Sequence, residues 1–168
     1  MKNLYLLAIA FCFGIAAKAQ TINFPDANFK NMLLTANTNN LIALNASDVF
    51  IKIDTNNDGE IQIEEALLVK KLQFNGYNFE DQSNVALSVI GLEYFDGVES
   101  IIFDDKYLPV LDVSGMASLK YISTSYTKIT AINASGSASL LEINLMNMSI
   151  TNTIDVSNAV NLRIVGAS

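Results

Sequence analysis

Apolar residues recur at a nearly constant spacing through the second half of the chain, and this recurrence restricts the possible folds more than any other feature. Four segments approximate the pattern L-x-x-L-x-L, and successive segments start about 21 residues apart. They are Val98–Phe103, Leu119–Thr124, Leu140–Leu145 and Leu162–Ala167. Thr124 is their one polar exception, and Val69–Phe74 is a candidate earlier copy that precedes a longer insertion.

A second apolar cluster follows each of the first three copies. A unit of this length contributes one short strand and cannot bury its apolar side alone, so the copies are expected to stack. The alternative is an ordinary all-β sandwich, because strands about 8 to 12 residues apart can imitate two strands per repeat. The clusters are Leu108, Leu111 and Val113; Ile129, Ile132 and Ala134; and Ile150, Ile154 and Val156.

The segment Asp54–Glu65, DTNNDGEIQIEE, carries oxygen-bearing side chains at alternate positions and then a glycine. It matches the calcium-loop pattern D-x-[DN]-x-[DN]-G-x5-E at every position. Calcium takes six to eight oxygen ligands at about 2.3 to 2.6 Å, and a short loop can wrap it only if the chain bends sharply midway. Gly59 permits that bend because it has no Cβ to strain.

Each position of this loop has an expected role, which makes calcium the expected cofactor. Three side chains offer oxygens early in the loop, a backbone carbonyl and a water-mediated contact follow, and a final carboxylate chelates with both oxygens. In that order the metal ligands are Asp54, Asn56, Asp58, Glu60, Gln62 and Glu65. The alternative is a turn rich in Asn and Asp, since Asn-Asn-Asp-Gly is also good turn chemistry, but such a turn does not require Glu65.

The loop resembles that of an EF-hand, although its flanks differ from a regulatory one. The preceding Val49–Ile53 is rich in β-branched residues and predicts a short strand, whereas Glu64–Lys71 predicts a short exiting helix. A calcium sensor normally pairs two hands, and no second matching loop occurs in the sequence. We therefore expect a structural calcium site. A calcium-responsive signalling or buffering module is the alternative.

Taken together, these segments resemble secreted bacterial leucine-rich repeat proteins with an N-terminal calcium-loop cap. The resemblance implies a right-handed solenoid of short repeats that is exported, often attached to the cell surface, and used for adhesion or recognition. The similar segments are Phe24–Leu34, the loop with Glu64–Ala66, Gly91–Phe95, and Leu111–Ser114 with its echoes Ile132–Ser135 and Ile154–Ser157.

The expected fold class is α+β, a short helical cap with a calcium loop followed by a leucine-rich repeat solenoid of short parallel strands. Residues 20–68 form the expected cap, in which Asp26 caps a helix from Ala27 to about Thr35 with Phe29 and Met32 on its apolar face. Residues 69–168 form the expected repeat region. The sequence ends inside a repeat without a polar capping unit, so we expect a truncated chain.

Residues 1–19 predict a cleaved secretory signal peptide, with a basic residue near the start, a short apolar stretch and small residues at Ala17 and Ala19. An uncleaved membrane anchor is the alternative. Cleavage would remove the single cysteine, and the balance of 10 basic against 17 acidic residues would become 8 against 17. Such an acidic surface repels phosphate backbones and anionic lipids, so we expect no nucleic-acid partner and no direct membrane insertion after cleavage.

A ligand surface is expected on the repeat strands, where the positions outside the core face one common side. Tyrosine beside acidic groups suits a protein or polysaccharide ligand, and an ordinary solvated face is the alternative. The expected surface comprises Glu99, Ile102, Tyr121, Ser123, Glu142 and Asn144.

Catalysis finds little support in the sequence, and we expect no enzyme. The chain has no histidine, and its one cysteine lies in the signal segment, so the common general bases and nucleophiles are missing. The adjacent acids Asp104 and Asp105 would point to opposite faces of a strand and could not flank one bond. The expected function is an exported calcium-binding module for binding or adhesion, secreted or at the cell surface.

Overall fold

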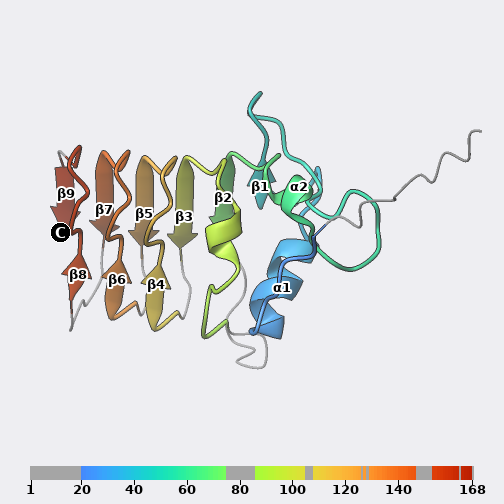
Figure 1. The fold of residues 1–168 in the computed structure, drawn as a ribbon, viewed down its shortest axis with the longest axis horizontal. Helices are drawn as coiled ribbons and strands as arrows, with labels where there is room; N and C mark the ends of the chain where they lie inside the picture. The colour runs from blue at the N-terminus through green and yellow to red at the C-terminus, as the bar shows by residue number, and fades with distance from the viewer. Residues whose placement is uncertain are drawn as a thin grey trace, which may run out of the picture.

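The computed structural model describes residues 20–74, 86–104, 108–125, 127, 129–146, 153–162 and 164–167. The predicted signal peptide, residues 1–19, lies outside them, as do Asp105 and Ile150. Figure 1 shows an elongated molecule in which two rows of strands follow a helical N-terminal part. The elements are α1 (Ala27–Leu34), β1 (Ala43–Leu44), α2 (Ile63–Ala66), β2 (Lys71–Phe74), the 3-10 helix η2 (Leu92–Tyr94), β3 (Ser100–Asp104), β4 (Val110–Asp112), β5 (Tyr121–Ser125), β6 (Ala131–Asn133), β7 (Glu142–Met146), β8 (Ile154–Asp155) and β9 (Ile164–Ala167).

The larger sheet has six strands in the order β1-β2-β3-β5-β7-β9, and only the β1–β2 pair is antiparallel. The copies lie in register, because each strand residue pairs with the corresponding residue of the next copy. Ile101 pairs with Ile122, Ile122 with Ile143, and Ile143 with Val165. Leu72 pairs with Ile101 in the same way, so β2 is the earlier copy before the longer insertion.

A second, three-stranded parallel sheet runs beside the first in the order β4-β6-β8. Its strands point opposite to β3, β5, β7 and β9 of the larger sheet (Figure 1). Leu111 and Ile132 point into the core and are buried. The second apolar cluster of each copy therefore forms a strand of its own.

The predicted fold class is wrong. The described residues form a mixed α/β structure with two α-helices and two mostly parallel sheets, and not an α+β leucine-rich repeat solenoid. The prediction assigned one strand to each copy, but Val110–Asp112, Ala131–Asn133 and Ile154–Asp155 have extended backbone and pair with one another. The alternative of an all-β sandwich does have two strands per repeat. The strands of such a sandwich are antiparallel, however, whereas β4, β6 and β8 pair in parallel.

The N-terminal part follows the prediction at α1 and departs from it on either side of the calcium-loop segment. Asp26 caps α1, and the helix buries Phe29, Met32 and Leu33, as the sequence predicts. The predicted exiting helix stops at Ala66 rather than at Lys71. The reason is that the Lys70 N–H donates to the Leu44 carbonyl at 2.7 Å, which draws the chain into the sheet.

The predicted strand at Val49–Ile53 is also wrong. Within the described residues this segment makes a single antiparallel bridge, from Phe50 to Leu44. Ile53 is nevertheless buried, because it packs into the core at the start of the calcium-loop segment.

One continuous apolar core extends through the described residues, from Ile22 to Ala159. Where the helical part meets the sheets, phenylalanine rings follow one another. Phe24 lies 5.9 Å from Phe29, Phe29 lies 6.2 Å from Phe74, and Phe74 stacks on Phe103 at 4.6 Å, measured between ring centroids. No helix in the described part of the chain is long and apolar enough to span a bilayer.

Candidate functional site

The segment Asp54–Glu65 is a compact loop that bends at Gly59, whose φ is +78°. The Asp54 carboxylate is buried and receives two backbone donors from the far side of the loop. The Asp58 N–H donates to Oδ1 and the Gly59 N–H to Oδ2, both at 3.2 Å. These bonds close the first half of the loop around the first predicted ligand. A Cβ at position 59 would meet nothing within 4 Å, so packing does not require glycine there. The positive φ does, because residues with a Cβ rarely adopt it.

The second half of the loop is closed by Glu65, which is also buried. Its Oε1 accepts from the Thr55 N–H at 2.7 Å and from the Thr55 hydroxyl at 2.8 Å. Its Oε2 accepts from the Gln62 N–H at 3.1 Å, which forms a capping box at the start of α2. Glu65 therefore joins both ends of the loop, although the calcium-loop pattern assigns no role to Thr55.

Three other predicted ligands meet one another between these two carboxylates. The Asn56 amide donates to Asp58 Oδ2 at 2.9 Å and to Gln62 Oε1 at 3.2 Å, and the Gln62 amide donates to Asp58 Oδ2 at 2.9 Å. Two amide donors thus occupy Asp58 Oδ2, a candidate ligand oxygen. A flip of the Asn56 side-chain amide would place its oxygen, which can bind a cation, where its NH₂ group now lies.

The Asp58 carboxylate is held in its charged form. The Glu60 N–H donates to Asp58 Oδ1 at 2.8 Å and, against the smaller opposing effect of desolvation, keeps the pKa of this carboxyl below its ordinary 3.8. Its side-chain bonds to Asn56 and Gln62 act in the same direction. Asp58 is therefore ionised at any pH at which a calcium site would be used.

Lysines contact the outer side of the loop. Lys30 of α1 bonds to Glu60 Oε1 at 2.6 Å, so the Glu60 side chain points away from the loop interior. The backbone carbonyl of Glu60, and not its side chain, is then the group for the predicted metal contact, as the calcium-loop pattern requires. Lys52 bonds to Asn57 and lies 3.8 Å from Asp54 Oδ2.

The predicted ligands thus lie within one loop, but its acids do not converge. No group of three or more His, Cys, Asp or Glu side chains among the described residues is arranged to hold a metal ion. Asp54 and Glu65 accept from backbone N–H groups, and Asp58 Oδ2 accepts from the amides of Asn56 and Gln62. The chemistry of the donors suits a hard cation, and the amides of Asn56 and Gln62, whose NH₂ groups now donate to Asp58 Oδ2, would have to present their oxygens instead.

The loop is joined directly to the N-terminal segment and to the core. The Ile22 N–H donates to the Ile61 carbonyl at 2.8 Å, and the Ile63 N–H donates to the Gln20 carbonyl at 3.0 Å. Ile61, at the eighth loop position, is fully buried. The loop is therefore in direct contact with the first residues of the described chain, and it continues into α2, which leads into β2.

The predicted ligand surface lies on the outward face of β3, β5 and β7. Ile102, Ser123 and Asn144 pair in register and form one row across the sheet, and Tyr121 and Glu142 pair in the row beside it. Tyr121 is 46% exposed and the others are half-buried. Five of the six predicted residues therefore share one face.

Glu99 is the sixth, and it lies just before β3 rather than on it. It bonds to Lys120 Nζ at 2.6 Å, so Lys120 neutralises its charge. The strand residue that pairs with Tyr121 is Ser100, and Gln73 of β2 continues the row of Ile102. Sequence reasoning missed both, although the early copy at Val69–Phe74 already placed Gln73 one repeat before Ile102.

Comparison with family models, with curated proteins and with solved structures finds no match to this chain.

Proposed function

We propose that this protein is an extracellular, non-enzymatic module for binding or adhesion, whose N-terminal part is stabilised by one calcium ion. A protein or polysaccharide is the partner class, and the exposed face of β3, β5 and β7 is its binding surface. The observation that carries the proposal is the loop itself. Two buried carboxylates, Asp54 and Glu65, close it from either end, with Asn56, Asp58 and Gln62 between them.

The residues of the loop favour a divalent cation on electrostatic grounds. Asp54, Asp58 and Glu65 would hold it together with the amide oxygens of Asn56 and Gln62, and it would supply two positive charges among three carboxylates. Two described lysines compensate part of this charge: Lys52 Nζ lies 3.8 Å from Asp54 Oδ2 and is partly exposed, and Lys30, which pairs with Glu60, acts on Asp58 through its charge. Two lysines at the periphery leave three carboxylates of one loop with net negative charge, so the loop gains stability when they share a cation.

The experiment is a thermal melt of the purified protein in 10 mM calcium and in excess chelator, followed by circular dichroism. Extracellular loops of this kind have dissociation constants as weak as about 10⁻⁴ to 10⁻³ M, so 10 mM calcium would contribute about 1.4 to 2.7 kcal/mol. For a chain of this size that corresponds to a rise in melting temperature of roughly 3 to 10 °C. Equal melting temperatures, together with no heat in a calorimetric titration, would dispose of the calcium site.

Two neighbouring glutamates provide a matched pair of variants. Glu65→Gln removes the buried carboxylate, whereas Glu64→Gln removes an exposed one that is adjacent in the chain. Glu65→Gln is expected to abolish the calcium-dependent rise in melting temperature, and Glu64→Gln to preserve it. A dye for exposed apolar surface is included in both melts. A large calcium-induced increase in its fluorescence would favour the signalling alternative over a structural site.

A further inference from the structure

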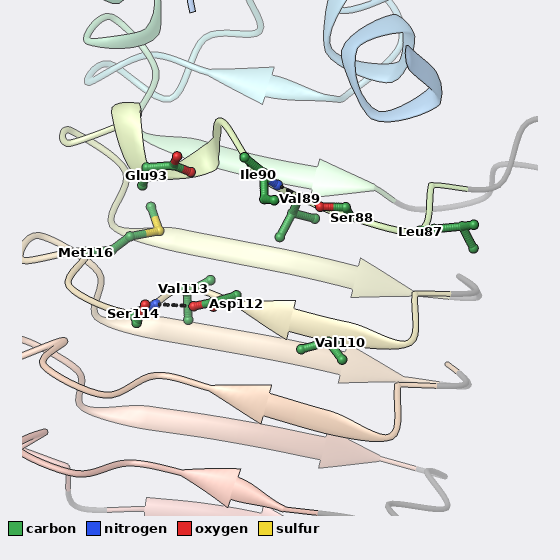
Figure 2. A pocket seen from close by; sticks show the side chains of 10 residues that line it. All are labelled: Leu87, Ser88, Val89, Ile90, Glu93, Val110, Asp112, Val113, Ser114 and Met116. Carbon is green, nitrogen blue, oxygen red and sulfur yellow. Dashed lines mark hydrogen bonds between the residues drawn. The ribbon is translucent and has the colours of Figure 1, made fainter. Parts of the chain in front are cut away.

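A groove separates β4 from the segment Leu87–Glu93, on the side of the molecule that carries the smaller sheet. Its volume is about 560 Å³, within the range of about 300 to 1,000 Å³ that is usual for ligand pockets. Figure 2 shows Leu87 and Ile90 on one wall and Val110 on the other. These three apolar side chains are 60%, 54% and 43% exposed, respectively.

The β4 wall presents backbone groups to this groove that have no strand partner among the described residues. Along β4, alternate residues bond toward β6, because the Ala131 N–H donates to the Pro109 carbonyl and the Val113 N–H donates to the Asn133 carbonyl. The N–H and C=O groups of Val110 and Asp112 must then point the other way, toward the groove. In the described part of the chain β4 is an edge strand, paired only with β6.

The opposite wall does not complete the sheet because side chains take its backbone donors. Asp26 Oδ2 accepts from the N–H groups of Leu87 and Ser88 at 2.7 and 3.1 Å. The Ile90 N–H donates to Ser88 Oγ at 3.2 Å, and the Gly91 N–H to Glu93 Oε2 at 2.7 Å. The wall is thereby held as an irregular segment beside β4, and no described strand pairs with this edge of β4.

The charge of the groove is of one sign. Glu93 and Asp112 are its ionisable lining residues, one on each wall, and no described lysine or arginine lines it. Asp112 Oδ1 accepts from the Ser114 N–H at 3.0 Å, and Asp112 Oδ2 accepts from the Asn133 amide at 3.2 Å, so the carboxylate is fixed in place. An occupant with positive charge is favoured over an acidic one.

We propose that this groove binds an extended, basic peptide segment of a partner protein, which adds to the free edge of β4. Backbone groups of the peptide bond to Val110 and Asp112, an apolar side chain lies between Ile90 and Val110, and lysine or arginine lies near Glu93 and Asp112. This site is separate from the calcium loop and from the exposed face of β3, β5 and β7. Its failure would leave the proposed function untouched.

The test uses the purified protein and three fluorescein-labelled peptides, with binding measured by fluorescence anisotropy in 50 mM salt. The first peptide is a capped heptamer of alternating lysine and valine. The second replaces each lysine by glutamate, and the third carries N-methyl groups at alternate backbone positions. The first is expected to bind at least tenfold more tightly than either of the others. Equal binding of the methylated peptide would overturn the proposal, because it lacks the donors that an added strand needs, and so would no binding at all.

Variants locate the binding site. Val110→Pro removes one donor that faces the groove without touching the bonds to β6, and it is expected to weaken binding at least tenfold. Asp112→Asn introduces the residue type that the next copy has at the paired position, Asn133. Asn133 Oδ1 accepts from the Ser135 N–H just as Asp112 Oδ1 accepts from the Ser114 N–H, so the variant keeps this turn and removes only the charge. Combined with Glu93→Gln, it is expected to weaken binding at least fivefold and to flatten the salt dependence. Unchanged binding in either variant would overturn the proposal.

A matched pair of exposed valines controls for non-specific charge effects. Val110→Lys and Val160→Lys introduce the same group at sites that are 43% and 79% exposed, but only Val110 lines the groove. Only Val110→Lys is expected to reduce binding. Sedimentation of the protein without peptide tests whether a second copy fills the groove instead. A dimer that Val110→Lys converts to monomer would overturn the peptide proposal.

Discussion

Gly91 and Gly115 show how one residue type serves two different physical purposes in this chain. Both have positive φ, at +106° and +72°, a region that residues with a Cβ rarely adopt. A Cβ at Gly115 would meet nothing within 4 Å, whereas a Cβ at Gly91 would lie 2.4 Å from the Phe24 ring. Gly115 is therefore required by its backbone alone, and Gly91 by its backbone and by packing.

Alanine substitutions are expected to separate these two effects. Gly115→Ala should destabilise the protein by about 1 to 2 kcal/mol, the typical cost of the left-handed conformation. Gly91→Ala should cost about 1 to 3 kcal/mol more, because the Phe24 ring must move out of a packed core. Urea unfolding of both variants measures the difference. Equal losses would mean that Phe24 moves freely, contrary to its close packing against Gly91.

The Glu99–Lys120 pair should respond to acid in a defined direction. The hydrogen bond from Lys120 lowers the pKa of the Glu99 carboxyl below its ordinary 4.5, and desolvation opposes this only in part. A group whose pKa is lowered by folding contributes stability above its unfolded pKa and loses that contribution as pH falls through the folded value. Both side chains are about 40% exposed, so the contribution is at most about 0.5 kcal/mol.

Carboxyl NMR titration of Glu99 in the wild type and in Lys120→Met measures this effect. The titration midpoint is expected to rise in the variant, and its stability deficit at neutral pH should disappear in acid. An unchanged midpoint would show that Lys120 does not hold this carboxylate in solution.

Asp26 joins two elements that are distant in the sequence. Its Oδ1 caps α1 by accepting from the N–H groups of Asn28 and Phe29 at 2.9 and 3.0 Å, while its Oδ2 accepts from Leu87 and Ser88. One carboxylate therefore fixes the start of a helix and one wall of the groove beside β4.

Asp26→Asn is expected to separate these two roles. The amide oxygen can still cap α1, but its NH₂ group cannot accept from Leu87 and Ser88, so we expect a loss of about 2 kcal/mol. Hydrogen exchange should become faster at Leu87 and Ser88 and stay slow in α1. Asp96→Asn, at an exposed position eight residues after Ser88, is the control and should change little. Faster exchange throughout α1 would indicate that the cap also fails.

Elements that depend on local chemistry could be predicted, and those that depend on distant partners could not. The Asp26 cap, the apolar face of α1 and the spacing of the larger sheet follow from neighbouring residues and from the repeat. The strands β4, β6 and β8 have two or three residues each, too few for an alternating pattern to distinguish them from turns. The predicted exiting helix fails because Lys70 bonds to Leu44, a contact that no local pattern reveals.

The same division applies to the candidate sites. The spacing of Asp54, Asp58 and Glu65 is a local signal, and the structure places all three in one loop. The groove depends on Asp26 reaching the distant Leu87, and no sequence motif marks that contact. Apolar residues at Leu87 and Ile90 were the available signal, and they are equally typical of a core.

At the scale of the whole molecule, the phenylalanine rings connect the helical part to the sheets. Phe74 is fully buried and lies between Phe29 of α1 and Phe103 of β3. Since the core is continuous across this contact, calcium bound at the loop is expected to stabilise both parts in one cooperative unfolding transition.

Phe74→Ala is expected to weaken that connection. Removal of a fully buried phenylalanine typically costs about 3 to 5 kcal/mol. Hydrogen exchange should accelerate more in α1 than in β7, which lies two strands beyond β3 in the larger sheet. Tyr121→Ala, on the exposed face, is the control and is expected to change stability by no more than about 0.5 kcal/mol. Equal acceleration in α1 and β7 would show that the two parts still unfold together in the variant, so that Phe74 is not what couples them.

The in-register pairing of β3, β5 and β7 has an evolutionary consequence. A tandem duplication of residues 121–141, within one gene, would insert one strand into each sheet and repeat the β5-to-β6 segment intact. The strands on either side of the two copies, β3 and β7, would still contact the same residue types as they do now. A lineage carrying such a gene could lengthen the protein in whole units by unequal recombination, and leave the Asp54–Glu65 loop and the groove beside β4 as they were.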